Sequence, residues 1–224
     1  MVAHVHQFQI IQREPGHARI RIVTMPDYDA PAEEDKLRRI FKSHLGENAR
    51  VEIEYPPEIA ATVAGMRIVG AYFPNGQAPD SDKFAYKQAW LQALTGWLAQ
   101  ELAAHPALAL MGDFNIAPED RDVHDPVAWA GQIHCTDVER AAFRALLDLG
   151  LRDAFRLFEQ PERLWSWWDY RNLAFRKNQG LRIDHILLSP ALAAHATACM
   201  IDKQPRRNER PSDHAPVMVE LADD

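Results

Sequence analysis

The chain has 224 residues, of which 47% are hydrophobic and 25% charged, and its formal net charge is −7. The hydrophobic fraction suits a folded core and excludes a disordered chain, and the acidic balance argues against a general nucleic-acid binder with a basic surface. The two cysteines are too few for a disulfide framework, and neither an apolar run of the ~18 residues that span a membrane nor a signal peptide is visible, so a soluble, reduced, cytoplasmic protein is expected.

The first part of the chain predicts a small unit of its own. Its expected elements are, in order, a strand over 6–11, a turn at Glu14-Pro15-Gly16, a strand over 18–23, a helix over 31–46 and a strand over 51–55. This order indicates a ββαβ unit over residues 1–58. Pro56 and Pro57 follow its last strand, so the boundary to a second domain, residues 59–224, is placed there.

The rest of the chain predicts a mixed α+β domain. Its expected elements are strands over 66–73, 108–111, 181–188 and 217–221 and helices over 83–105 and 136–149. The apolar residues of the first helix fall on one stripe at helical spacing. Thr136 and Glu139 form a capping box at the start of the second helix, and Gly150 closes it.

Polar residues follow directly after the buried strand over 108–111. Gly112, Asp113 and Asn115 come next, and Pro118 then stops regular structure. An ordinary Asx turn explains this stretch taken alone. The carboxyl end of a strand is also where open sheets of α and β elements keep their sites, so the same residues are candidates for chemistry.

Further polar residues lie at strand ends or turns, namely Tyr72, Asp184 and the pair Asp213-His214. Carboxylates gathered at one sheet edge repel each other unless a cation joins them, and oxygen ligands without thiolates favour Mg²⁺ or Mn²⁺. Such a cation with a carboxylate base is what phosphodiester hydrolysis requires. Taken singly, Asp213-His214 is also explained by a turn or helix cap, and Asp184 by a buried ion pair.

Asp184 lies inside an apolar strand, where an unpaired charge is costly. His214 is the expected partner, because an Asp–His pair fixes the tautomer of the ring and favours its charged form.

Residues 171–210 carry eight basic and three acidic side chains, so this region is about +5 and the rest of the chain about −12. A solvated face explains the imbalance, but a basic rim beside an acidic pocket also suits a phosphate polymer.

Five motifs occur together in one order. They are Tyr72-Phe73-Pro74-Asn75-Gly76, Gly112-Asp113-Phe114-Asn115-Ile116-Ala117-Pro118, Trp165-Ser166-Trp167-Trp168-Asp169-Tyr170-Arg171, Gly180-Leu181-Arg182-Ile183-Asp184-His185 and Pro211-Ser212-Asp213-His214-Ala215-Pro216. The set resembles the exonuclease III family, the bacterial abasic-site endonuclease branch of the endonuclease/exonuclease/phosphatase superfamily, over residues 59–224. The resemblance implies a partial four-layered α/β sandwich, with two β-sheets flanked by helices.

The resemblance also implies an activity and its residues. The activities are incision at abasic sites, 3′-to-5′ exonuclease action on duplex DNA and 3′-phosphatase action, with Mg²⁺ or Mn²⁺ as the cofactor. We expect the chain to be monomeric. The residues implied are Tyr72, Asp113, Asn115, Asp184 and His214 for catalysis, Asp113, Asn115 and Asp213 for the metal, and Trp167, Arg171, Arg176, Lys177 and Arg182 for DNA.

Within that set, Asp113 would activate the attacking water and Asn115 would position it. His214, paired with Asp184, would stabilise the transition state, and Tyr72 would contact the scissile phosphate. Trp167 would pack on the gap at an abasic site, and the four basic side chains would lie along the DNA backbone.

The chain departs from the family pattern before Tyr72. Members open with a strand ending in Trp-Asn-x-Asn and continue to a strand ending in Gln-Glu, and that Asn and Glu supply the principal metal ligands. Here Asn48 is the only Asn before Asn75, and no Gln-Glu pair occurs among the first 75 residues. We therefore expect the family's N-terminal third to be missing, and a catalytically impaired DNA-binding remnant is the alternative function.

Residues 1–58 resemble instead the C-terminal subdomain of phenylacetate–CoA-ligase-like adenylating enzymes. The resemblance rests on residues 7–11, the helix end Leu45-Gly46 and residues 51–55. The hypothesis is a gene fusion near residue 59. Met66 stands where those enzymes carry a lysine, so no ligase activity is expected. A superfamily phosphodiesterase for lipid or inositol phosphates is a further alternative, which the aromatic run and the basic segment disfavour.

Overall fold

The computed structural model describes residues 3–14, 17–28, 53–54, 59–63 and 65–222. The predicted helix over 31–46 and the boundary at Pro56-Pro57 lie outside these residues. Both predicted N-terminal strands are present as longer strands, β1 (Ala3–Glu14) and β2 (His17–Tyr28), which pair antiparallel as a hairpin.

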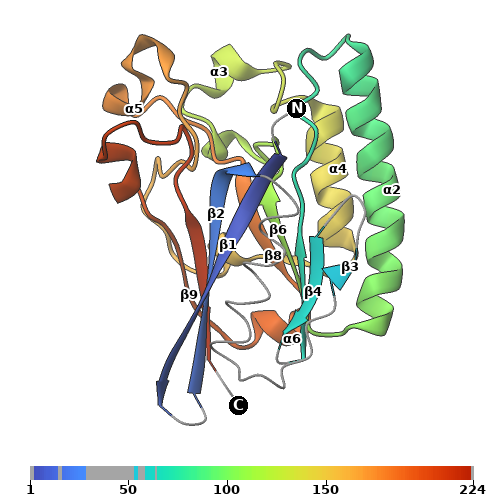
Figure 1. The fold of residues 1–224 in the computed structure, drawn as a ribbon. Coiled ribbons are helices and arrows are strands. Elements are labelled where there is room, and N and C mark those ends of the chain that lie inside the picture. The colour runs from blue at the N-terminus through green and yellow to red at the C-terminus, as the bar shows by residue number, and fades with distance from the viewer. Residues whose placement is uncertain (1–2, 15–16, 29–52, 55–58, 64, 223–224) are drawn as a thin grey trace.

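A six-stranded mixed sheet runs through the middle of the molecule (Figure 1). Its strands are β3 (Ile53–Glu54), β4 (Ile59–Val63), β5 (Met66–Gly70), β6 (Leu108–Asp113), β8 (Asp184–Leu188) and β7 (Arg152–Asp153), in that spatial order. Strand β6 pairs parallel with β5 and antiparallel with β8. The register sets Asp113, the last residue of β6, opposite Asp184, the first of β8. Two predicted site residues therefore meet at one edge of the sheet.

Successive residues of the central strands face opposite sides of this sheet. Met111 and Ile186 face a core that they share with the hairpin of β9 (Ala196–Ile201) and β10 (Val217–Leu221). Strand β2 lies against β10, so the N-terminal hairpin continues this layer. The molecule thus has a second layer of strands on one face of the main sheet.

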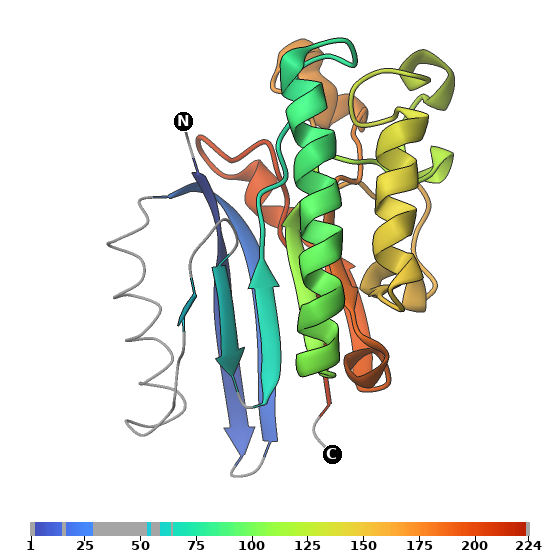
Figure 2. The ribbon, with the colours of Figure 1, turned by 90° about the vertical axis from the view of Figure 1, so that its right-hand side faces the viewer.

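Two helices, α2 (Asp82–Ala104) and α4 (Asp137–Asp148), cover the other face (Figure 2). Leu110 and Leu187 of the sheet share a core with three buried leucines of α2, which are Leu91, Leu94 and Leu98. These leucines recur every three or four residues, which confirms the predicted apolar stripe.

The helix ends follow from local hydrogen bonds. Ser81 Oγ accepts from the Phe84 amide at 3.1 Å at the start of α2. The capping box predicted for Thr136 and Glu139 is present at the start of α4. Gly150, predicted to close α4, has φ +97°, a left-handed conformation that costs glycine little.

Short elements occupy the remaining connections. They are helices α3 (Pro126–Trp129), α5 (Ala174–Lys177) and α6 (Pro190–Ala193) and 3₁₀ turns η1 (Asp120–Asp122), η2 (Ala154–Leu157), η3 (Arg171–Leu173) and η4 (Gln204–Arg207). Among the described residues, no helix has both the length and the apolar character needed to cross a membrane.

The predicted α+β class, with two sheets flanked by helices, is confirmed. Strands β4, β7 and β9 were not predicted, and the strands expected over 66–73 and 181–188 are shorter, since β5 ends at Gly70 and β8 begins at Asp184. Strand β3 pairs with β4 across the expected domain boundary. The separate origin of residues 1–58 stays a prediction.

Candidate active site

Asp113 is buried at the end of β6, and Asn115 holds it there. The Asn115 backbone amide donates to Asp113 Oδ1 at 2.9 Å, and its side-chain amide donates to Asp113 Oδ2 at 3.0 Å. Asn115 has φ +52°, a left-handed conformation that asparagine tolerates better than most residues. The stretch is therefore an Asx turn that also fixes both oxygens of a buried carboxylate.

His214 and Asp184 form the predicted pair. His214 Nδ1 lies 2.9 Å from Asp184 Oδ2, and the Asp184 side chain is only 2% exposed. The hydroxyl of Ser166 accepts from the backbone amides of Ile183 and Asp184, each at 3.0 Å, which fixes the start of β8. The ring of His214 is thus oriented by a carboxylate that is itself held in place.

The charges of these groups depend on one another. Burial acts to lower the pKa of His214, but the charge and hydrogen bond of Asp184 outweigh it and raise that pKa to about 10. Burial raises the pKa of Asp113 to about 7; the charge of His214 opposes this rise, and that of Asp184 adds to it. Near neutral pH the site therefore holds a charged imidazole beside a carboxyl that titrates in this range.

Asp113, Asp184 and His214 each offer one ligand atom, and these atoms lie within 4.8 Å of one another. Two buried carboxylates with one imidazolium leave a negative charge uncompensated, which suits a hard cation. The predicted metal set was different. Asp213 lies outside this group, and Asn115 turns its amide nitrogen, not its oxygen, toward Asp113.

Asp213 lies in the loop between η4 and β10 and contacts the aromatic loop that precedes η3. Its Oδ2 accepts from the indole nitrogen of Trp167 at 3.0 Å. Trp165 and Trp168 are buried in the core, whereas Trp167 is half-buried and also bridges to the backbone of His214. Of the three tryptophans of this run, Trp167 is the one placed beside the site.

Tyr72 lies half-buried just after β5. Burial and the negative charge of Asp113 raise its pKa, and a hydrogen bond with the side chain of Asn115 opposes the rise. Asn75, from the same loop, donates to Asn115 Oδ1 at 3.1 Å. The loop after β5 and the turn after β6 thus meet at the Asn115 side chain.

The predicted DNA-contacting basic side chains divide into two groups. Arg171, Arg176 and Lys177 are exposed on η3 and α5. Arg182 is 1% exposed and pairs with two carboxylates, Asp122 at 2.6 Å and Asp153 at 2.8 Å. The prediction for Arg182 is wrong, because a guanidinium enclosed between two internal carboxylates cannot lie along a DNA backbone.

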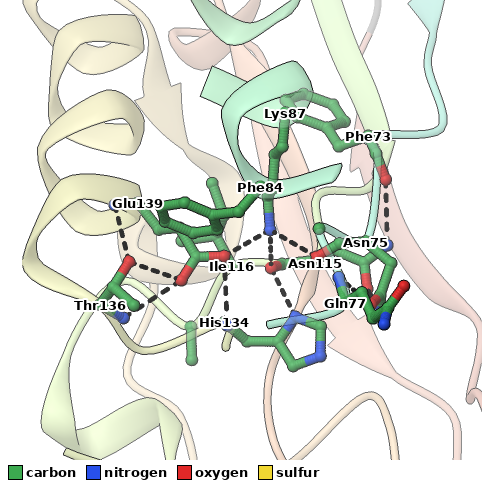
Figure 3. A network of polar contacts seen from close by, with 12 residues as sticks. Phe73, Asn75, Gln77, Phe84, Lys87, Asn115, Ile116, His134, Thr136 and Glu139 are labelled. Carbon is green, nitrogen blue, oxygen red and sulfur yellow. Dashed lines mark hydrogen bonds and ion pairs between the residues drawn. The ribbon is translucent and has the colours of Figure 1, made fainter. Parts of the chain in front are cut away.

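Several residues of this neighbourhood were not predicted. Lys87 and Glu139 form a buried ion pair beside Asn115, and His134 Nδ1 lies 2.7 Å from the carbonyl oxygen of Asn115 (Figure 3). Burial lowers the pKa of His134 to about 4, so this ring is neutral. The capping box gave Glu139 only a role at the start of a helix, and nothing in the sequence distinguishes Lys87 from its neighbour Lys83, so neither stood out.

Comparisons with known proteins agree with this geometry. The model of the Endonuclease/Exonuclease/phosphatase family matches residues 18–214. Exodeoxyribonuclease III of Haemophilus influenzae is 36% identical over 164 residues, which are 70% of this chain and 61% of that protein. The chain thus spans about three fifths of that relative's length.

Two solved structures are more similar in sequence. The 3′-5′ exonuclease NExo of Neisseria meningitidis is 46% identical with a TM-score of 0.74, and the match covers 77% of this chain and 71% of that one. The 3′ phosphatase NExo from Neisseria bound to product DNA hairpin is 45% identical with a TM-score of 0.72, and that match covers 78% and 70%. The chain belongs to the Endonuclease/Exonuclease/phosphatase family.

Proposed function

We propose that this protein hydrolyses phosphate esters in duplex DNA, as a DNA-repair nuclease of the exonuclease III type. The observation that carries the proposal is the arrangement at the end of β6, where Asp113 lies beside the Asp184–His214 pair. This set combines a carboxylate base with the imidazolium of His214. Attack of water on a phosphate ester needs such a base and such a positive charge.

Asp113 acts as the base in this proposal. Its pKa of about 7 lies close to neutral pH, where a general base combines an adequate ionised fraction with adequate basicity. The two hydrogen bonds from Asn115 aim its carboxylate and prevent it from rotating. Asp113 accepts a proton from water, the oxygen of that water attacks phosphorus, and the bond from phosphorus to the leaving oxygen of the ester breaks.

His214 stabilises the negative charge that grows on the phosphoryl oxygens. The ring is charged below pH of about 10, and Asp184 fixes its orientation through Nδ1. Tyr72 approaches the phosphate from the loop after β5 as a hydroxyl donor; its raised pKa keeps that hydroxyl protonated.

The cation of this proposal is Mg²⁺ or Mn²⁺. Asp113 would hold it with its carboxylate, Asp213 would approach it from the neighbouring loop, and Asp184 would stay paired with His214. When bound, such an ion takes up charge on the phosphoryl oxygens and assists departure of the leaving group.

The DNA would contact the protein beside the aromatic loop. Trp167 offers a half-buried indole next to the site, and Arg171, Arg176 and Lys177 are exposed on the adjacent turn and helix. Exposed cations of this kind bind phosphates without reading sequence. The names of the two NExo structures favour 3′ ends of DNA as the substrate. Abasic-site incision is the second activity in this proposal.

The experiment is a comparison of three duplexes, which carry a recessed 3′-hydroxyl end, a 3′-phosphate at a nick and one abasic site. The full chain is assayed with Mg²⁺, with Mn²⁺ and with EDTA. We expect metal-dependent release of nucleotides or phosphate from the 3′ ends. We also expect the protein to behave as a monomer in gel filtration at the same concentration. No turnover of any of the three substrates by a folded protein would overturn the proposal.

The alternative is a protein that binds DNA without cleaving it. It is favoured by the small ligand set, because in the described part of the chain the metal group consists of two carboxylates and one histidine. Salt-dependent binding of the same duplexes without turnover would support this alternative.

A further inference from the structure

A second charged pair lies behind the Asp113–Asn115 turn. Lys87 of α2 and Glu139 of α4 form an ion pair in which both side chains are 0% exposed (Figure 3). Each side chain crosses from its helix to the region directly after β6. None of the groups assigned above to base, transition-state or DNA contacts belongs to this pair.

Both partners are fully hydrogen-bonded. Besides Glu139, Lys87 Nζ donates to the carbonyl oxygen of Asn115 at 2.8 Å and to that of Asn75 at 3.3 Å. Glu139 also accepts from the backbone amides of His134 and Thr136, each at 3.1 Å. The pair thus connects two helices with both loops that carry site residues.

Stability alone does not account for this arrangement. Replacing a fully buried ion pair by apolar groups of similar volume is often neutral or stabilising, because the pair loses its hydration when it is buried. The pair also places the Lys87 ammonium against the backbone carbonyl of Asn115, a residue in a left-handed conformation. Asn115 in turn fixes both oxygens of Asp113. A continuous series of contacts therefore runs from Lys87 to the proposed base.

We infer that Lys87 and Glu139 are positioning residues for the proposed reaction, which hold the Asn115 backbone so that Asp113 and the loop of Tyr72 keep their productive geometry. The inference rests on the proposed function. The pair acts through Asn115 and does not touch the substrate. A displacement of about 1 Å at a reacting group is enough to lower a rate by about 10²-fold, so small shifts of this turn matter.

The test is the double variant Lys87→Met/Glu139→Gln. Methionine fills the volume of the lysine stem without a charge, and glutamine keeps one oxygen that accepts from the amide and hydroxyl of Thr136, so the cap of α4 remains. No buried charge is left without a partner, and the variant is therefore expected to fold with a Tm close to that of the wild type.

The matched control is Arg67→Met/Glu101→Gln. This pair joins β5 to the other end of α2 at 2.7 Å, and its side chains are 5% and 15% exposed. It has the same chemistry and involves the same helix, but Glu101 lies 14 residues from Lys87, about 21 Å along the axis. The control reports what loss of a buried pair in α2 does away from the site.

Two measurements decide the inference. The first is kcat and KM for the substrate that the wild type turns over, where we expect the test variant to lose about 10²-fold in kcat with KM nearly unchanged. The second is hydrogen exchange of the Asn115 backbone amide, which we expect to become faster while the amides of β6 keep their protection. The control variant should change neither quantity.

A stable test variant with wild-type kcat and wild-type exchange at Asn115 would overturn the inference. An inactive wild type would instead refute the proposed function. The exchange measurement remains valid in that case, because it needs neither metal nor substrate.

Discussion

Replacing Asp184 by asparagine tests how the site keeps His214 charged. The carboxamide has nearly the same shape and can still accept from Nδ1, so the variant removes the charge and leaves the packing of a residue that is 2% exposed. Burial acts to lower the pKa of His214, and Asp184 makes the largest contribution among the groups that raise it to about 10. Without that charge the pKa should fall to its ordinary value of about 6.5 or below.

The magnitude follows from those two values. At pH 8 the wild-type ring, with a pKa of about 10, is nearly all protonated, whereas a ring with a pKa of about 6.5 is only about 3% protonated. If the charged ring is required, kcat at pH 8 should drop roughly 30-fold. The basic limb of the pH–rate profile should move from near pH 10 to about pH 6.5 or lower.

The assay is the pH dependence of kcat between pH 5 and about 10.5, at saturating DNA and metal. Asp148→Asn is the matched control, because it removes one carboxylate from the exposed end of α4 and changes the net charge equally. A basic limb that stays near pH 10 in Asp184→Asn would refute the reasoning.

Three further predictions concern stability and DNA binding. Arg182→Met leaves Asp153 buried without its cation and leaves Asp122 with Arg156 alone, so denaturant titration should give a loss of about 3–5 kcal/mol, whereas DNA affinity of the folded fraction should stay the same. Arg171→Ala, at an exposed position, should change the free energy of unfolding by less than about 0.5 kcal/mol and reduce the salt slope of DNA binding by about 1; an unchanged slope would contradict a phosphate contact. Burial lowers the pKa of His185 to about 3 and that of His134 to about 4. Because the unfolded rings bind protons from about pH 6.5 downward, the contribution of these two rings to stability, followed by thermal unfolding in EDTA, should be complete above that pH and decline toward pH 3.

The polar residues at strand ends were predictable because their signals lie in the neighbouring sequence. A buried strand followed by Gly112, Asp113 and Asn115 can only present those side chains at a strand end. The cost of burying Asp184 in an apolar strand pointed to a cationic partner, and the structure places His214 there. Helices α2 and α4 followed from apolar spacing and caps, which are also local signals.

Features that depend on tertiary contacts were not predictable. Arg182 lies in a basic segment and looked like a surface cation until the fold enclosed it between two carboxylates. Lys87 and Glu139 are 52 residues apart, and nothing in the chain pairs them before α2 and α4 pack on the same sheet. Strand β9 was missed because only its pairing with β10 marks it as a strand.

The central proposal is that the carboxylate of Asp113 is the general base for hydrolysis of a phosphate ester in DNA. The most direct measurement is a single-turnover assay of the wild type and Asp113→Asn on the duplex with a recessed 3′-hydroxyl end, with Mg²⁺ and with EDTA. We predict that the wild type releases nucleotides from the 3′ end in a metal-dependent reaction. The single-turnover rate of the variant should be lower by at least about 10²-fold, with DNA binding retained. Equal release by Asp113→Asn would contradict the assignment of the base and of the site.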